Sequence, residues 1–159
     1  MKAIYKSIFF SVALLVGMVS CDKDELPPTG PQDNAEKLVV GTYSGAWTRL
    51  NVDTDEVVTG SGSITFSVSD AYSNNVSVIT LDASGIDLGI AEPMTSVCNI
   101  TRLSSGEFTY WNQTAANPFG VQFYGKVSPD GEATMTFSRT LKEGRKDVNF
   151  QFTFAGNKQ

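Results

Sequence analysis

From Leu38 to the C-terminus, apolar and polar residues alternate with a period of two, and clusters of Gly, Asn, Asp and Pro divide the alternating stretches. Because successive side chains of a β-strand point to opposite faces, this period predicts antiparallel strands and leaves little room for a helix. The clearest strand runs from Ala133 to Leu141, with apolar residues on one face and hydroxyl side chains on the other. Arg139 interrupts its apolar face.

Seven further segments alternate in the same way: 39–47, 64–68, 75–81, 97–103, 107–111, 121–127 and 148–154. Turn residues stand between several of them, as in Pro129-Asp130-Gly131 and in Lys142–Lys146 around Gly144. Closing such strands into a cylinder removes exposed edges, and Gly41 and Gly45 permit the first strand to bend. The pattern therefore predicts an all-β, antiparallel barrel of about eight strands; a β-sandwich uses the same alternation and is the alternative.

The beginning of the chain has a different pattern. Lys2 and Lys6 accompany an apolar run, Ile8–Val19, which is too short to span a bilayer and is followed directly by Ser20 and Cys21. This stretch resembles the lipobox of bacterial lipoprotein precursors. The resemblance implies that residues 1–20 are a signal peptide and that the membrane is a partner through a diacylglycerol on Cys21.

A charged, proline-rich stretch follows the cysteine, and its composition predicts a flexible tether over residues 21–36, with the barrel domain at 37–159. Lys23, Asp24 and Glu25 resemble the export signal with which Bacteroides-group bacteria send lipoproteins to the outer leaflet of the outer membrane. An acidic linker without that role is the alternative. We therefore expect a protein anchored to the outer membrane, on the cell surface or on the periplasmic face.

The charge balance excludes some function classes. The chain has 12 basic and 17 acidic residues, and without Lys2 and Lys6 the balance is 10 to 17, a net charge of −7. Such a surface repels phosphates, so we expect no nucleic-acid partner, and the short cluster of Lys142, Arg145 and Lys146 fits a solvated turn.

Two residue types bear on catalysis. The chain has no histidine, which removes Ser-His and Cys-His catalysis and argues against a zinc site. Once Cys21 is lipidated, Cys98 is the remaining thiol, and its place in an apolar strand favours a packing role over a nucleophile. We expect no enzyme activity, no cofactor and no metal.

Short motifs spread over most of the mature chain resemble the calycin-like (lipocalin-like) lipoproteins of Bacteroides-group bacteria. They are Tyr43-Ser44-Gly45, Asp87-Leu88-Gly89, Phe123-Tyr124-Gly125-Lys126-Val127 before Asp130-Gly131, and Val148-Asn149-Phe150 running to Phe154-Ala155-Gly156. The resemblance implies an antiparallel barrel of about eight strands and no catalytic residues. Gly45-Ala46-Trp47 approximates the lipocalin Gly-x-Trp signature.

In lipocalins an arginine from a late strand stacks on the tryptophan of the first strand and closes one end of the barrel. The resemblance implies that Trp47 and Arg139 form this pair here, which would explain a charge on an otherwise apolar strand face.

Aromatic residues gather around the amide-rich stretch from Asn112 to Asn117. Aromatic rings and amides together suit sugar or lipid ligands, although half or more of these rings must belong to the core. The candidate ligand-binding residues are Tyr110, Trp111, Asn112, Phe119 and Tyr124.

Carboxylates offer weaker candidates. Asp53, Asp55 and Glu56 could hold a hard cation such as calcium, but a solvated hairpin tip is the favoured interpretation. Asp82 and Asp87 would have to converge in one cleft to act as a glycosidase pair.

We expect a membrane-anchored lipoprotein that binds a small or lipophilic molecule inside the barrel or at its mouth. The alternative is a surface module that binds a protein or a glycan through its loops, with an interior filled by Phe66, Phe137, Phe150 and Phe152. An enzyme is the third hypothesis.

Overall fold

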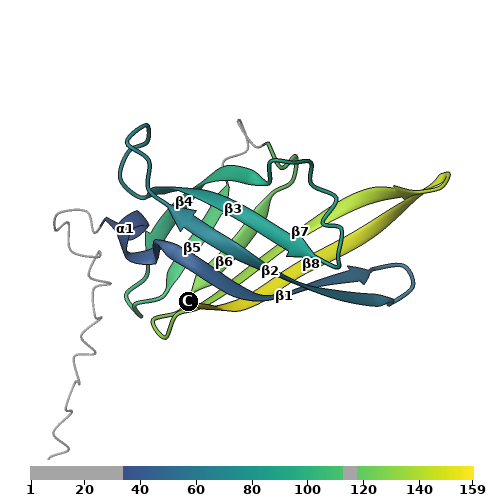
Figure 1. Cartoon of the computed structure of the whole chain (residues 1–159), viewed down its shortest axis with the longest axis horizontal. Helices are drawn as coiled ribbons and strands as arrows, with labels where there is room; N and C mark the ends of the chain where they lie inside the picture. The colour runs from purple at the N-terminus through teal and green to yellow at the C-terminus, as the bar shows by residue number, and fades with distance from the viewer. Residues whose placement is uncertain (1–33, 113–117) are drawn as a thin grey trace, which may run out of the picture.

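The computed structural model describes residues 34–112 and 118–159. They form one closed barrel in which the strands follow one another around the cylinder in chain order (Figure 1). The strands are β1 (Gly41–Asn51), β2 (Val57–Ser67), β3 (Val76–Ser84), β4 (Thr95–Arg102), β5 (Phe108–Asn112), β6 (Phe123–Val127), β7 (Glu132–Glu143) and β8 (Lys146–Lys158). The predicted all-β barrel is confirmed.

Every strand pairs antiparallel with the next, and β1 pairs with both β2 and β8, which closes the cylinder. Trp47, for example, lies opposite Gly60 on β2 and Phe154 on β8. The turn predicted at Pro129–Gly131 joins β6 to β7, and Gly131 has φ 86°, a conformation that glycine adopts without strain. Since no strand edge is left along the body of the cylinder, the barrel prediction is correct and the sandwich alternative is not.

A short helix, α1 (Ala35–Val39), covers one end of the barrel (Figure 1). Ala35 and Val39 are buried, and the buried Glu36 accepts a hydrogen bond from the backbone N–H of Asn75 at 2.8 Å. The predicted tether boundary after residue 36 is therefore too late, and a helix forms where none was expected. The alternation that identifies strands carries no signal for one helical turn. No helix among the described residues is long and apolar enough to cross a membrane.

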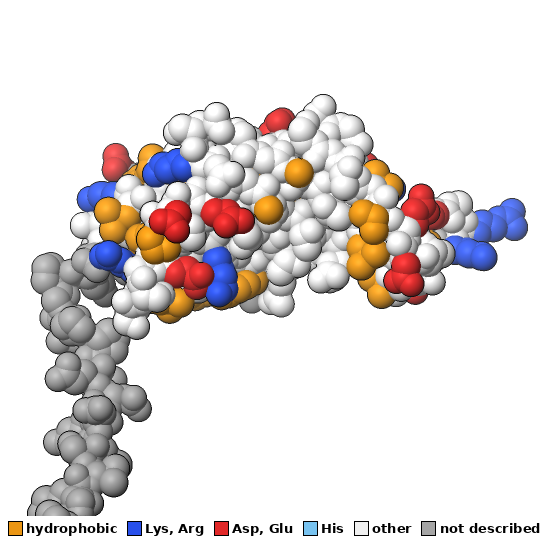
Figure 2. All heavy atoms as spheres, turned by 90° about the horizontal axis from the view of Figure 1, so that it is seen from below, with side chains coloured by type: hydrophobic (Ala, Val, Ile, Leu, Met, Phe, Trp, Pro, Cys, Tyr) orange, Lys and Arg blue, Asp and Glu red, His pale blue; other side chains and the backbone are white. Residues whose placement is uncertain are grey.

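The opposite end is covered by the loop between β3 and β4, whose Leu88 and Ile90 are buried. At this end β7 and β8 continue past the barrel as a two-stranded hairpin (Figure 1). Figure 2 shows Lys and Arg side chains at the tip of this hairpin, with Asp and Glu side chains beside them. Lys142, Arg145 and Lys146 are exposed, as expected of a solvated turn.

Aromatic rings fill the interior. Phe66 contacts both Tyr43 and Tyr110 edge-on, with ring centroids 5.7 and 4.9 Å apart. Phe137 stacks on Phe152 at 4.8 Å, and Trp47 packs against Phe137 and Phe154. Each such pair stabilises the fold by about 0.5–1.5 kcal/mol, in addition to the free energy gained by burying its apolar area.

Glycines on the inner face make room for these rings. A Cβ atom on Gly62 would lie 2.6 Å from Cδ1 of Trp47, and one on Gly125 would overlap the ring of Tyr110. The rings thus lie directly over backbone positions where any side chain would collide with them. This arrangement explains why glycines recur in strands where they otherwise weaken the sheet.

The predicted pair of Trp47 and Arg139 does not form. Trp47 Nε1 donates a hydrogen bond to the carbonyl oxygen of Asp82 at 2.9 Å, and Arg139 Nη1 donates one to the carbonyl oxygen of Phe119 at 2.9 Å. The register separates them, because Arg139 lies opposite Phe150 while Trp47 lies opposite Phe154, further along β8. Arg49, rather than Arg139, lies over an aromatic ring: its Cζ is 4.9 Å from the centroid of Phe150.

We predict that replacing Gly125 with valine strongly destabilises the barrel, because the new side chain would displace Tyr110. Overpacking of this kind costs about 1–3 kcal/mol or more, measured as the free energy of unfolding in urea. Ala155→Val is the matched control, since Ala155 is exposed on β8 and valine suits a strand. Equal stability of the two variants would contradict the account of the interior.

Candidate functional site

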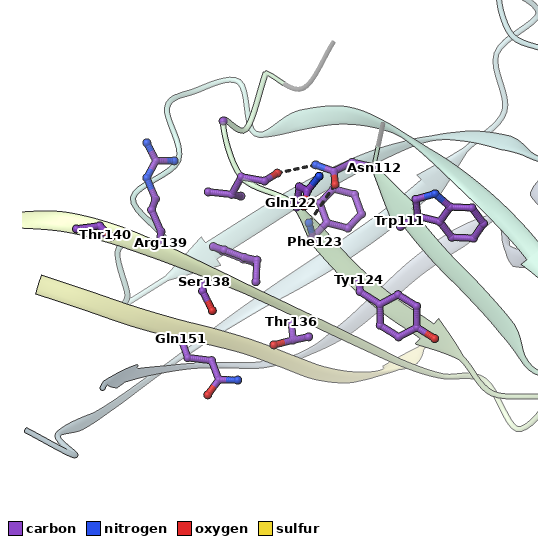
Figure 3. A pocket seen from close by; sticks show the side chains of 13 residues that line it. Trp111, Asn112, Gln122, Phe123, Tyr124, Thr136, Ser138, Arg139, Thr140 and Gln151 are labelled. Atoms are coloured by element: carbon purple, nitrogen blue, oxygen red, sulfur yellow. Dashed lines mark hydrogen bonds between the residues drawn. The ribbon is translucent and has the colours of Figure 1, made fainter. Parts of the chain in front are cut away.

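A groove of about 980 Å³ lies on the outside of the barrel beside β6 and β7 (Figure 3). It exists because these neighbours differ in length: β6 begins at Phe123, which pairs with Phe137, whereas β7 continues to Glu143. Beyond Phe137, the segment from Gly120 to Gln122 takes the place of a pairing strand and leaves a space against β7.

Two exposed aromatic side chains form one end of the groove. Trp111 on β5 and Tyr124 on β6 are directly opposite each other in the sheet and are 37% and 44% exposed. Figure 3 shows both rings on the same side of the sheet. Burying such rings on the protein itself would be favourable, so their joint exposure beside a groove makes this surface the candidate binding site.

Hydroxyl and amide groups continue from these rings across the sheet. Thr136 pairs with Tyr124, and Ser138 pairs with Gln151 on β8. Together with Gln122, these side chains line the groove. Each hydroxyl or amide can both donate and accept hydrogen bonds, which suits a ligand with many hydroxyl groups.

Asn112 holds the wall of the groove in place. Its Nδ2 donates to the carbonyl oxygen of Val121 at 2.7 Å, and its Oδ1 accepts from the backbone N–H of Phe123 at 3.0 Å. The side chain is 5% exposed, so both ends of the amide are engaged with the backbone. Asn112 therefore positions the segment before β6 rather than offering its amide to a ligand.

Arg139 lies towards the other end of the groove, away from the two rings, and its side chain points to the opposite side of β7 from Thr136 and Ser138 (Figure 3). It is partly buried, and its hydrogen bond to the carbonyl oxygen of Phe119 ties β7 to the segment before β6. Among the described residues that line the groove, it is the one charged side chain.

The five predicted ligand-binding residues therefore divide into two groups. Trp111 and Tyr124 lie exposed on the groove, whereas Tyr110, Phe119 and Asn112 are buried, which corrects the prediction for these three. Tyr110 donates its hydroxyl to the carbonyl oxygen of Thr134 at 2.7 Å, and burial raises its pKa well above 10.0. The alternation of strand faces separates them, because neighbours such as Tyr110 and Trp111 must point in opposite directions.

Sequence reasoning missed the polar side of the groove. Thr136 and Ser138 were recognised as the polar face of a strand, but nothing in the sequence placed them beside Tyr124. Only the pairing of β6 with β7 brings them together.

The carboxylate candidates do not assemble a site. Asp82 is exposed on the outer face of β3, and Asp87 accepts a hydrogen bond from the backbone N–H of Gly89 at 2.7 Å, so Asp87 stabilises a turn. Asp53, Asp55 and Glu56 lie exposed at the tip between β1 and β2. Across residues 34–112 and 118–159, no group of three potential ligands is arranged to hold a metal ion.

Several candidates lie outside the described residues. They are the lipidation site Cys21, the export signal Lys23, Asp24 and Glu25, and the amide-rich positions 113–117.

Cys98 lies in the core with no exposed surface. Burial raises its pKa from 9.0 to about 12, although a hydrogen bond from the backbone of Ser77 opposes the shift. The reactive form of a cysteine is the thiolate, so this thiol is unsuited to nucleophilic chemistry at neutral pH.

No protein-family model matches the chain, and no curated protein matches it.

We predict that the stability of the barrel falls between pH 9 and pH 10 because of Cys98. Below pH 9 the thiol is protonated in both states; above it, the unfolded chain releases the proton while the folded chain keeps it. The free energy of unfolding therefore falls, by about 1 kcal/mol between pH 9 and pH 10. Urea unfolding at both pH values should show a smaller loss for Cys98→Ala than for the wild type, and equal losses would contradict the assignment.

Proposed function

We propose that this protein is a lipid-anchored barrel that binds carbohydrate on its outer face, in the groove beside Trp111 and Tyr124. The observation that carries the proposal is the pair of exposed rings at the end of a groove lined with hydroxyl and amide groups. The C–H face of a sugar ring packs on an aromatic ring, and its hydroxyl groups exchange hydrogen bonds with Thr, Ser and Gln side chains. The role is binding rather than catalysis.

The filled interior favours this proposal over a ligand held inside the barrel. Trp47, Tyr110 and Phe152 have no exposed surface. Trp47 and Tyr110 already lie against the backbone of Gly62 and Gly125, so these two rings cannot move further towards the sheet. An internal ligand would have to displace packed aromatic rings, at a cost of several kcal/mol. The outer groove needs no such rearrangement.

The position of the groove suits an anchored protein. The chain enters the barrel at the end covered by α1, and Trp111 lies near the end of β5 that is remote from this helix. If Cys21 carries the lipid, the helix end faces the membrane and the groove faces away from it. A glycan in solution or on a neighbouring surface could then reach the rings.

The proposed address is the outer membrane, and the proposed relatives are the calycin-like lipoproteins of Bacteroides-group bacteria. The lipobox and the stretch Lys23-Asp24-Glu25 support the location, and the short motifs together with the closed eight-stranded barrel support the relationship.

We predict that Trp111→Ala and Tyr124→Ala each weaken glycan binding by about tenfold or more, because aromatic anchors dominate small interfaces. A glycan array probed with the full-length chain in detergent would identify a ligand, and isothermal titration would give the affinities of the variants.

Tyr72→Ala is the matched control. Tyr72 is 45% exposed, close to the value for Tyr124, but it lies in the loop between β2 and β3 and does not line this groove. The control should bind as the wild type does. An equal loss in all three variants, or a wild type that binds no glycan, would overturn the proposal.

We predict that Cys21→Ser releases the protein from the membrane fraction, because its anchor is the lipid on that cysteine. Mass spectrometry of the N-terminal peptide should find a lipid adduct in the wild type and none in the variant. Replacing Lys23, Asp24 and Glu25 with alanine should retain the adduct but protect the protein from protease added to intact cells. A Cys21→Ser variant that stays membrane-bound would contradict the anchor, and unchanged cleavage after the triple replacement would contradict the export signal.

A further inference from the structure

The end of the barrel that carries α1 also carries a group of exposed apolar side chains. We propose that these side chains insert into the interfacial region of a lipid bilayer and hold this end of the barrel against the membrane. The inference rests on the proposed lipid anchor at Cys21 and adds a second membrane contact, made by the folded domain itself. The residues of this apolar rim are Leu38, Val40, Val68, Tyr72 and Leu103.

The topology of the barrel brings the apolar rim to one end. Each strand is antiparallel to the next, so the connections after β2, β4 and β6 lie at the same end as α1. Val68 and Tyr72 belong to the connection after β2, and Leu103 directly follows β4. Figure 1 shows α1 and the loop between β2 and β3 at the same end of the barrel. Of the nine large hydrophobic residues that are exposed in the described part of the chain, five lie here, so they are concentrated rather than scattered.

Hydrogen bonds hold the segments of the apolar rim together. The backbone N–H of Asn75 donates to Glu36 of α1 at 2.8 Å, and the carbonyl oxygen of Asn75 accepts from the N–H of Ile100 on β4 at 2.8 Å. Val68 and Tyr72 line a cavity of about 210 Å³ together with residues of α1. The helix, the loop after β2 and the end of β4 therefore form one surface.

The side chains of the rim are turned towards solvent. Ala35 and Val39 bury one side of α1, which leaves Leu38 52% exposed, and Tyr72 and Leu103 are 45% and 40% exposed. Moving apolar side chains from water into the boundary between headgroups and acyl chains is favourable. A tyrosine suits this boundary because its ring is apolar and its hydroxyl group is polar.

Basic residues accompany the apolar ones. Lys37 precedes Leu38 and Arg102 precedes Leu103, and both basic residues are exposed. Long basic side chains can lie along apolar surface while their charged ends reach lipid phosphates. Together with Asp70, they give the rim segments a net charge of +1, in a chain whose net charge is −5. By contrast, the exposed valines at the tip between β1 and β2 flank three acidic residues, which an anionic surface repels.

The place where the chain enters the barrel indicates the same partner. Cys21 precedes Asn34, the first described residue, by 13 positions, which span at most about 45 Å. Since the chain enters at α1, an anchor at Cys21 keeps the apolar rim close to the bilayer. The resulting effective concentration lets a weak apolar contact persist that would not hold the protein without the lipid.

The test measures the depth of spin labels on the full-length, lipidated chain in vesicles of phosphatidylcholine and phosphatidylglycerol. A nitroxide is attached to Leu103→Cys or, at the opposite end, to Val57→Cys; Cys98 is buried and does not react. The label at position 103 should collide severalfold less often with a water-soluble nickel chelate than the label at position 57, and more often with oxygen, which concentrates in bilayers. Equal collision rates at the two positions would mean that the barrel stands away from the membrane, and would overturn the inference.

The double variant Val68→Ser/Tyr72→Ser removes apolar surface from the rim without changing the labelled position. It should return the label at position 103 to water, while the chain keeps its lipid adduct and stays in the membrane fraction. Val52→Ser/Val57→Ser is the matched control, because both valines are exposed at the opposite end, and it should leave the label in the bilayer. Urea unfolding should show equal stability for the two variants, since all four replaced side chains are exposed. A label that stays in the bilayer in Val68→Ser/Tyr72→Ser would contradict the role of the rim.

The outcomes separate the rim from the anchor. A lipid adduct on Cys21 with the label at position 103 in water would overturn the inference and leave the anchor in place. A missing adduct would remove the anchor and, with it, the inference. Loss of nickel collisions without a gain in oxygen collisions would indicate contact with a protein, such as a second copy of the chain, and would also overturn it.

Discussion

The structure depends on aromatic rings that lie against glycine backbone inside the barrel. Trp47 lies over Gly62 and Tyr110 over Gly125, so the rings approach the sheet more closely than any side chain on those residues would permit. With Phe66, Phe137 and their neighbours, they occupy the space that a hollow barrel would leave for a ligand. Because packed rings fill the interior, the ligand site that we propose lies on the outer surface.

The outer groove follows from the unequal lengths of two neighbouring strands. β6 covers Phe123–Val127, whereas β7 covers Glu132–Glu143, so the longer strand continues without its neighbour. Asn112 then fixes the segment that precedes β6, and Arg139 ties β7 to the same segment through Phe119. The same contacts that hold the barrel wall together therefore shape the groove.

The period-two alternation predicted most of the fold from sequence. The segments at 133–141 and 148–154 belong to β7 and β8, and the barrel closes as expected. Helix α1 was missed because one turn of helix is too short to show a period, and its burial depends on contacts with the distant Asn75. The Trp47–Arg139 pair failed because it was transferred from a resemblance, whereas register along β8 determines which residues meet.

Only part of the candidate site could be predicted from the sequence. Strand alternation already separates Trp111 from Tyr110, but the sequence alone does not say which of the two faces outwards. The polar partners Thr136, Ser138 and Gln151 are distant in the chain, and only the pairing of β6, β7 and β8 brings them together.

The most direct test of an outer site on a filled barrel uses the two tryptophans of the chain as reporters. The indole N–H of Trp47 is buried and bonded to the carbonyl oxygen of Asp82, whereas Trp111 is exposed on the groove. In a nitrogen–proton NMR titration of the full-length chain with a glycan that it binds, the Trp111 indole signal should shift while that of Trp47 stays in place. A shift of the Trp47 signal with an unmoved Trp111 would place the ligand inside the barrel and contradict the account.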